Sequence, residues 1–289
     1  MEIKEIKRRV KSIREIRQIT RAMQTVATFR LKRSQERIEA ARPFARKISE
    51  VLVDVTSITR EFLHPFMERR RPRRVCFVVF TADRSLCGAF NMNIIKKAME
   101  EIRALESWQR VRIITVGKRG YNYFKRLPYK ILAHYQGIAA RPVFEKAREL
   151  GAFLKEKYLG GEVDEVILVY SRFYGVLSQK PREYRLLPIV PVESSGVKER
   201  IPVPFIYEPS PREILEHLVL RYLEAEIFRA MLETDAGENG ARMASMSASV
   251  TNAHDMEERL NHKYHQARQS IITNELAEIS GGARAVEEK

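Results

Sequence analysis

The apolar positions at the two ends of the chain form two long stripes with near-heptad spacing. The C-terminal stripe advances in steps of 3-4-3-3-4-4-3-4, a heptad pattern with one three-residue slip, through Met243, Met246, Val250, Ala253, Met256, Leu260, Tyr264, Ala267 and Ile271. The N-terminal stripe alternates steps of four and three through Ala27, Leu31, Ser34, Ile38, Ala41, Ala45, Ile48, Leu52 and Val55, and Ile3, Ile6, Val10 and Ile13 begin it upstream. A helix with an apolar seam needs a partner. The pattern therefore predicts a long antiparallel coiled-coil shaft built from both ends of the chain.

The C-terminal run contains one weak segment, at residues 234–240. Gly237 and Gly240 lie in it, and each glycine costs about 0.5–1 kcal/mol inside a helix. Two helices joined by a loop would fit this segment. We favour one long, weakened helix, because the apolar seam resumes after the glycines.

Between the two stripes, the period of the apolar pattern changes to that of buried strands. Apolar runs predict strands at residues 75–80, 111–116, 130–135, 166–170 and 184–190, with helices at 91–106, 121–127 and 144–158. This alternation predicts a small three-layer, Rossmann-like α/β domain. The predicted division is an N-terminal shaft helix and linker (1–73), an α/β domain (74–209) and a C-terminal shaft helix (210–289).

The charge of the chain is distributed unevenly. Residues 1–74 carry a net charge of +12, residues 75–209 carry +8, and residues 210–289 carry −5. Opposite charges favour pairing of the two terminal helices. The surplus on the N-terminal helix predicts an acidic partner, either nucleic acid or an acidic protein surface. No apolar run approaches the roughly 18 residues that cross a bilayer, and the first residues lack a signal-peptide core, so we expect a cytosolic protein.

The sequence lacks the motifs of an active site. Neither a phosphate-binding P-loop nor a G-x-G-x-x-G motif occurs, and Cys76 and Cys87 are too few for a disulfide framework or a zinc site. His254, His262 and His265 are interpreted as a solvated helical face, since no further ligand completes a metal set. Asp83 follows the first predicted strand, where α/β enzymes often place chemistry. We favour a loop carboxylate near a helix N-terminus there, and predict no catalytic residue, cofactor or metal.

Four motifs resemble those of one family. Residues 19–27 (ITRAMQTVA), 83–91 (DRSLCGAFN), 241–246 (ARMASM) and 272–283 (ITNELAEISGGA) are similar to the ITKAMxMVA, DRGLCGGLN, ARMxAM and ITxEIxEIxxGA patterns of the gamma subunit of F-type ATP synthases. The motifs occur in the family order and cover essentially the whole chain. In the second motif, Ser85 and Ala89 replace glycines, so we expect a less sharply turned loop.

The resemblance implies a rotary central stalk of a membrane-bound enzyme. Its shaft would lie inside a head of alpha and beta subunits, and its base would rest on the membrane c-ring beside an epsilon subunit. Proton or sodium flow would turn the ring, and the shaft would force the catalytic sites through successive conformations. The chain would then be a non-catalytic subunit, peripheral on the cytoplasmic side of a bacterial cell membrane.

The resemblance also implies roles for particular residues. The coupling interface with the catalytic head would contain Met23, Arg242, Gln269, Thr273 and Glu275; the bearing at the tip would contain Ile279, Gly281 and Gly282; the c-ring contact would contain Tyr207 and Glu208. Taken without the family, Met23 is a seam residue, Arg242 a surface charge and Glu208 a solvated turn carboxylate.

Two other classes of function remain as alternatives. A nucleic-acid-binding protein could use the basic N-terminal helix, but the basic residues surround the helix and no aromatic platform accompanies them. An α/β enzyme with coiled-coil arms is opposed by the missing catalytic and cofactor motifs. The partners predicted are therefore proteins and no nucleic acid.

Overall fold

The chain folds into two compact units that each contain part of both long helices. The computed structural model describes residues 3–58, 64–68, 71–106, 108–137, 142–176, 178–190, 208 and 210–287. Residues 1–27 and 243–289 form one unit, here the terminal unit, and residues 28–242 form the sheet unit. These two units are defined by which residues contact one another, and their boundaries cut through both long helices. The division at 73/74 and 209/210, which follows secondary structure, stays a prediction.

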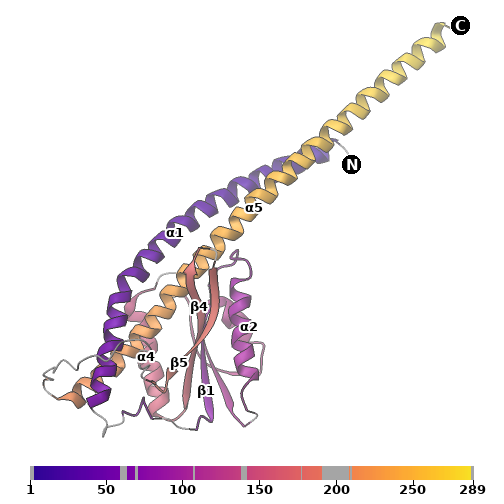
Figure 1. The fold of residues 1–289 in the computed structure, drawn as a ribbon. Helices are drawn as coiled ribbons and strands as arrows, with labels where there is room; N and C mark the ends of the chain where they lie inside the picture. The colour runs from indigo at the N-terminus through magenta and orange to yellow at the C-terminus, as the bar shows by residue number, and fades with distance from the viewer. Residues whose placement is uncertain are drawn as a thin grey trace. The chain divides into compact units, whose positions relative to one another are not determined.

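Ten elements follow one another along the chain (Figure 1). They are α1 (Ile3–Ile58), β1 (Arg74–Phe80), α2 (Phe90–Arg103), β2 (Arg110–Val116), α3 (Lys118–Phe124), β3 (Lys130–Tyr135), α4 (Phe144–Leu159), β4 (Glu165–Gly175), β5 (Ser178–Leu187) and α5 (Pro211–Glu287). The predicted helices and most of the predicted strands match these elements to within a few residues, and the predicted fold class is confirmed.

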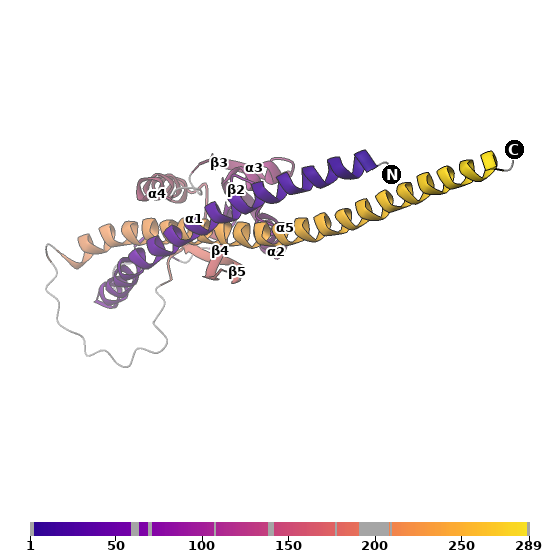
Figure 2. The same cartoon turned by 90° about the horizontal axis from the view of Figure 1, so that it is seen from above.

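The sheet unit has three layers around a five-stranded sheet with the order β3-β2-β1-β4-β5. Successive side chains of a strand point to opposite faces, and β1 is buried on both. Val75, Phe77 and Val79 pack with α2. Cys76, Val78 and Phe80 belong to the core that contains α4 and the parts of α1 and α5 in this unit. Figure 1 shows α2 on one side of the sheet and α4 with α5 on the other, and Figure 2 shows the same elements from above. The continuous apolar run of β1 reflects this two-sided burial.

The last two strands differ from the prediction. β4 and β5 pair antiparallel and form a hairpin, and β5 begins at Ser178, whereas the predicted strand begins at 184. β5 is an edge strand whose first residues alternate between exposed and half-buried. The other strands are predicted from apolar runs, and the first half of β5 is polar and contains Pro181, so it has no such run. Proline is tolerated there because β5 is an edge strand.

In the terminal unit, the C-terminal seam keeps a regular heptad spacing. Met256 is 53% exposed, whereas Glu257 is 7% exposed, so the predicted slip at Met256 is wrong. The buried carboxylate lies 2.9 Å from Arg14 Nε and 2.9 Å from Arg17 Nη1 on α1. The heptad position is taken by the charged residue Glu257, so a pattern of apolar residues alone does not show it.

Helix α5 is continuous through 234–240, which confirms one long helix. A Cβ atom at Gly237 would lie 2.9 Å from Phe90 Cε2 and 3.2 Å from Ser171 Oγ. At Gly240 it would lie 3.2 Å from the carbonyl oxygen of Val176. These glycines therefore allow α5 to approach α2 and the β4–β5 hairpin closely, which explains their presence despite their low helix propensity.

Replacing Gly237 with alanine should destabilise the protein. Overpacking against Phe90 and Ser171 costs about 1–3 kcal/mol, more than the gain of about 0.8–1 kcal/mol in helix propensity. Urea unfolding followed by circular dichroism measures the difference. Ser247→Ala, on an exposed part of the same helix, is the control and should be neutral or stabilising. Phe90→Leu should relieve part of the Gly237→Ala defect; equal defects in both backgrounds would contradict the proposed clash.

Candidate functional site

The loop of residues 81–90 lies where β1 ends, and it is braced at several points. The side-chain oxygen Oδ1 of Asn91 accepts a hydrogen bond from the Ala82 amide at 2.7 Å. Asp83 accepts bonds from the Lys118 amide and the Gly137 amide, both at 2.9 Å. Asp83 therefore holds the start of α3 and the turn after β3, which agrees with a loop carboxylate near a helix N-terminus.

The sequence predicts a less sharply turned loop because Ser85 and Ala89 replace glycines. The positive φ angles of the loop lie instead at two neighbouring residues. Leu86 and Gly88 adopt positive φ angles of 66° and 55°. Leu86 is 54% exposed. A non-glycine residue is uncommon in this conformation, so the braced loop holds an apolar side chain outward on a constrained backbone.

Arg242 of α5 ties the helix to this loop. Its Nη2 atom donates to the carbonyl oxygen of Ser85 at 3.4 Å and to Glu238 Oε1 at 2.5 Å, and its Nη1 atom donates to Asn239 at 3.4 Å. Arg242 is 7% exposed, so the alternative of a surface charge is wrong. Within the sheet unit, Arg242 therefore connects α5 to the loop through these hydrogen bonds, and we call this set of contacts the Arg242 clamp.

A buried polar layer joins α1 to α5 beside this clamp. Asp235 Oδ2 accepts a hydrogen bond from Ser34 Oγ at 2.6 Å, and Oδ1 accepts one from Asn239 Nδ2 at 3.0 Å. Burial raises the pKa of Asp235 to about 6 although the Ser34 hydroxyl favours the charged form. The Glu238 carboxylate raises this pKa further, and the guanidinium of Arg37 lowers it.

Both thiols are held in unreactive environments. Cys76 is fully buried in β1, and burial raises its pKa to about 12. Cys87 is 2% exposed, and burial also raises its pKa, against the influence of the Arg242 guanidinium. A nucleophilic cysteine needs a lowered pKa and access, so neither residue has the properties of one.

The other residues implied by the resemblance lie apart from this clamp in sequence. Met23 is half-buried in the terminal unit. Gln269, Thr273 and Glu275 are exposed on α5, and the hydroxyl of Thr273 donates to the carbonyl oxygen of Gln269 at 2.9 Å. Ile279 is 70% exposed. Gly281 and Gly282 belong to the last turns of α5. Glu208 is exposed, and Tyr207 lies outside the described residues.

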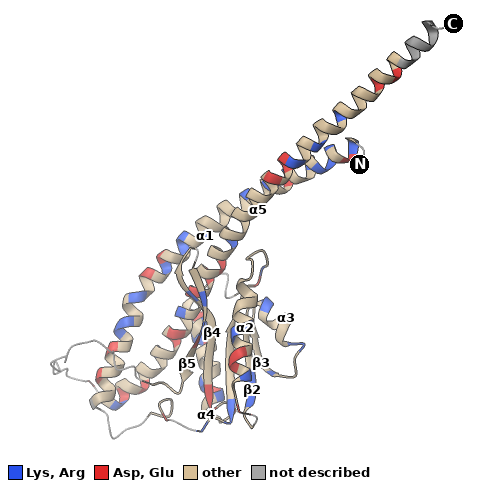
Figure 3. Cartoon of the chain, turned by 45° about the vertical axis from the view of Figure 1, so that its right-hand side comes forward, with Lys and Arg blue, Asp and Glu red and all other residues tan. Residues whose placement is uncertain are grey.

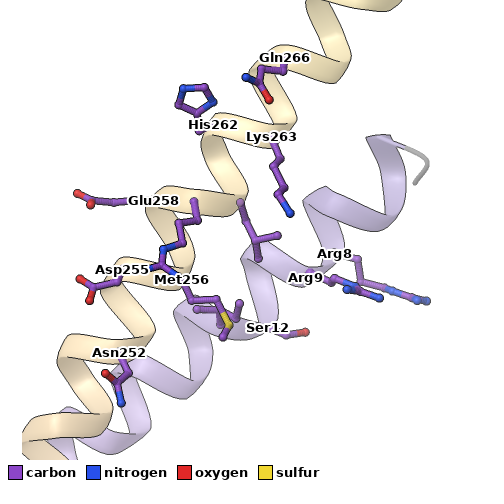
Figure 4. A pocket seen from close by; sticks show the side chains of 13 residues that line it. Arg8, Arg9, Ser12, Asn252, Asp255, Met256, Glu258, His262, Lys263 and Gln266 are labelled. Atoms are coloured by element: carbon purple, nitrogen blue, oxygen red, sulfur yellow. The ribbon is translucent and has the colours of Figure 1, made fainter.

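The terminal unit contains a groove between α1 and α5 that sequence reasoning missed (Figure 4). Its volume is about 1130 Å³, and Met256 lines it. Cations from both helices face it together with Asp255 and Glu258, so its charge is mixed: the basic residues are Arg8, Arg9, Arg259 and Lys263. No signal in the sequence indicates this groove, because the apolar pattern places Met256 in the buried seam, whereas Met256 is 53% exposed in the structure.

A stretch of α5 exposes large apolar side chains along a single helix. All residues from 268 to 280 are exposed, and among them are Ile271 (45%), Ile272 (44%), Leu276 (62%) and Ile279 (70%). Ile16, Ile19 and Val26 of α1 are also at least half exposed. Contiguous exposed apolar surface marks interaction sites.

The described part of the chain shows neither a metal centre nor a membrane span. Groups of three or more metal-ligating side chains do not occur among these residues. Within the same residues, every helix is too short or too polar to cross a bilayer. His254 contacts Arg17 at 3.2 Å and Glu258 at 3.5 Å.

Comparison with known proteins decides the family. The family model described as ATP synthase matches residues 2–286. The ATP synthase gamma chain of Desulforamulus reducens is 42% identical over 98% of this chain and 99% of its own length, and that of Heliobacterium modesticaldum is 40% identical over 98% and 99%. The chain belongs to the ATP synthase gamma chain family. The resemblance carried by the four motifs is thereby confirmed.

Solved structures agree with the fold of this gamma chain. A chain in the central stalk and c-ring structure of the Tetrahymena thermophila mitochondrial ATP synthase has a TM-score of 0.60 at 21% identity, covering 80% of this chain and 98% of that one. A chain in the Euglena gracilis mitochondrial ATP synthase has a TM-score of 0.57 at 17% identity, covering 92% and 95%.

Removing the Arg242 clamp of this gamma chain should expose Cys87. In Arg242→Ala, Ser85 loses its hydrogen bond and Glu238 loses its ion pair, so the loop should open and Cys87 should react with an aromatic disulfide reagent at least tenfold faster. The rate of thiol release measures this. The Cys87→Ser background reports Cys76 alone and should stay slow. An unchanged rate in Arg242→Ala would show that the remaining anchors of the loop suffice.

The raised pKa of Asp235 predicts a pH-dependent stability. A carboxyl group whose folded pKa lies above its unfolded value of about 3.9 stabilises the fold while protonated, and this stability is lost as pH rises from about 4 to about 6. Asp235→Asn should therefore stabilise the protein more at pH 7.5 than at pH 4.5, by about 1–3 kcal/mol. Urea unfolding at both pH values measures the difference. Glu39→Gln, at an exposed position of α1, should show no such change; a similar gain there would point to general charge effects.

Proposed function

We propose that this gamma chain is the rotary central-stalk subunit that couples ion-driven rotation of a membrane c-ring to conformational changes in a catalytic alpha/beta head. The terminal unit would turn within the head, and the end of the sheet unit near Glu208 would contact the c-ring. The chain itself would contribute no catalytic residue, and its epsilon subunit partner would bind the stalk.

The observation that carries this proposal is the bare apolar helix at residues 268–280. Four large side chains there are 44–70% exposed, although burial of such a residue is worth about 1.5–3 kcal/mol. Nothing described in this chain covers them. Ile272, Leu276 and Ile279 follow an i, i+4, i+7 spacing and therefore share one face of the helix. In the proposed arrangement, the subunits of the surrounding head would bury this face.

The charge of α1 supports the same proposal. Figure 3 shows Lys and Arg positions recurring along α1, interspersed with uncharged and acidic ones. Such a distribution fits an acidic protein surface that passes around the helix. It does not form the single stripe with aromatic residues that a nucleic-acid-binding helix would present. The braced loop, with Asp83 engaged by backbone amides, likewise gives no support to a separate enzymatic activity.

Within this proposal the residues implied by the family take different parts. Met23 is unbranched and half-buried, so it can adapt to different surfaces as the shaft turns. Gln269, Thr273 and Glu275 would offer polar contacts to the head, and Ile279, Gly281 and Gly282 would form the bearing. Arg242 would act on coupling through the loop that it holds. The complex would lie on the cytoplasmic face of a bacterial membrane.

Polar substitutions in the exposed apolar stretch at residues 268–280 should weaken assembly with the head and leave the folding of the chain unchanged. In the variant with Ile271, Ile272, Leu276 and Ile279 all changed to Gln, the free energy of unfolding of the purified chain should change by no more than about 0.5 kcal/mol per site. Its co-purification with co-expressed alpha and beta subunits should fall severalfold. Met246→Gln, at a seam position only 3% exposed, is the matched control and should destabilise the chain itself. Undiminished co-purification of the fourfold variant would overturn the proposed enclosure.

A further inference from the structure

A basic hollow lies at the edge of the sheet where β1 and β2 begin. Its volume is about 630 Å³, and it is lined by Trp108 and four arginines: Arg71, Arg73, Arg74 and Arg110. β1 and β2 are parallel, so both begin at this edge and end at the opposite one. The Arg242 clamp holds the loop that follows the end of β1 and therefore lies at that opposite edge. No acidic residue lines the hollow among the described residues.

The backbone around the hollow is fixed by hydrogen bonds. The side-chain amide of Gln109 donates to the carbonyl oxygen of Pro72 at 2.9 Å. The Arg110 amide donates to the carbonyl oxygen of Arg73 at 2.7 Å, and the Arg73 amide donates to Asp164 Oδ2 at 3.0 Å. The two segments that supply the lining side chains are therefore tied to each other and to the start of β4.

Only one of the four guanidinium groups is neutralised. Arg74 lies 3.2 Å from both carboxylate oxygens of Asp164, through Nη2 and Nε. Within the described parts of the chain, Arg71, Arg73 and Arg110 have no carboxylate at ion-pair distance, and all three are exposed. Three like charges held around one hollow repel one another, and a bound anion would remove that repulsion.

The chemistry of the lining indicates which anion fits. The planar guanidinium fork matches the oxygen spacing of phosphate, and the volume lies in the range of about 300–1,000 Å³ that is common for small-ligand sites. The guanidinium carbon of Arg71 lies 4.9 Å from the ring centroid of Trp108, which is 43% exposed. An aromatic ring beside the cations would cover the less polar part of a phosphate ester.

We propose that this hollow is a binding site for a phosphate-bearing anion, held by Arg71, Arg73 and Arg110 and covered by Trp108. The anion could be a free phosphate compound or the headgroup of an acidic phospholipid. This site is separate from the proposed coupling role and stands on the geometry of the sheet edge alone.

Trp108 gives a direct test, because it is the only tryptophan of the chain. The purified full-length chain is titrated at 150 mM salt with pyrophosphate, and separately with phosphatidylglycerol vesicles and phosphatidylcholine vesicles, while tryptophan emission is recorded. We expect a saturable change in emission with pyrophosphate or with phosphatidylglycerol, and none with phosphatidylcholine. Competition of pyrophosphate with the acidic vesicles would distinguish a shared site from a headgroup site.

Two triple variants separate the site from the general charge of the chain. In Arg71→Gln/Arg73→Gln/Arg110→Gln, the affinity measured through Trp108 should fall at least tenfold. In Lys32→Gln/Arg33→Gln/Arg42→Gln, which removes the same charge from exposed positions of α1, it should remain within about twofold. Circular dichroism spectra confirm folding of both variants.

Three results would overturn the proposal. The first is the absence of any emission change in the wild-type chain. The second is an equal loss of affinity in the two triple variants, which would reduce the effect to net charge. The third is tighter binding of an acidic peptide, such as oligoglutamate, than of either phosphate probe, which would make the hollow a protein-docking surface.

Discussion

The close approach of α5 to the sheet at Gly237 is the constraint on which the sheet unit depends. Because no side chain separates them there, Phe90 and Ser171 reach the helix backbone. One turn and a half further on, Arg242 reaches the carbonyl oxygen of Ser85. Two residues before Gly237, and so on the opposite side of the helix, Asp235 accepts a hydrogen bond from Ser34 of α1. A few turns of one helix therefore fix the sheet, the loop after β1 and the second long helix at once.

Each unit also places a carboxylate in its helix–helix seam. In the terminal unit, Glu257 is held by Arg14 and Arg17; in the sheet unit, Asp235 is held by Ser34 and Asn239. Shifting either helix by one position would take the buried carboxylate of α5 away from its partner on α1, which is unfavourable. An apolar seam alone tolerates such shifts far better. The polar residues therefore select the register, and the apolar residues supply most of the attraction.

Much of the fold could be predicted because the two helices and the central strands differ in their apolar period. The β1 run is apolar on both faces, and the N-terminal seam from Ala27 to Val55 follows buried positions closely. The remaining features depend on contacts that are distant in sequence. Glu257 replaces Met256 in the seam because two arginines of α1 neutralise it. Gly237 reads as a weak point until Phe90 and Ser171 are placed beside it. Arg242 reads as a surface charge until the loop at Ser85 covers it.

The same close approach places α5 where Rossmann-like sheets usually bind nucleotides. With the order β3-β2-β1-β4-β5, the connections leave β1 toward β2 on one side and reach β4 on the other, so the crevice between β1 and β4 is the topological switch point where such sheets bind ligands. Here Gly237 of α5 lies against Ser171 of β4 and Phe90 of α2. In the loop after β1, Asp83 accepts hydrogen bonds from two backbone amides, and the carbonyl oxygen of Ser85 accepts one from Arg242. The crevice is filled by the chain's own helix, so the sheet serves as a rigid anchor for α5.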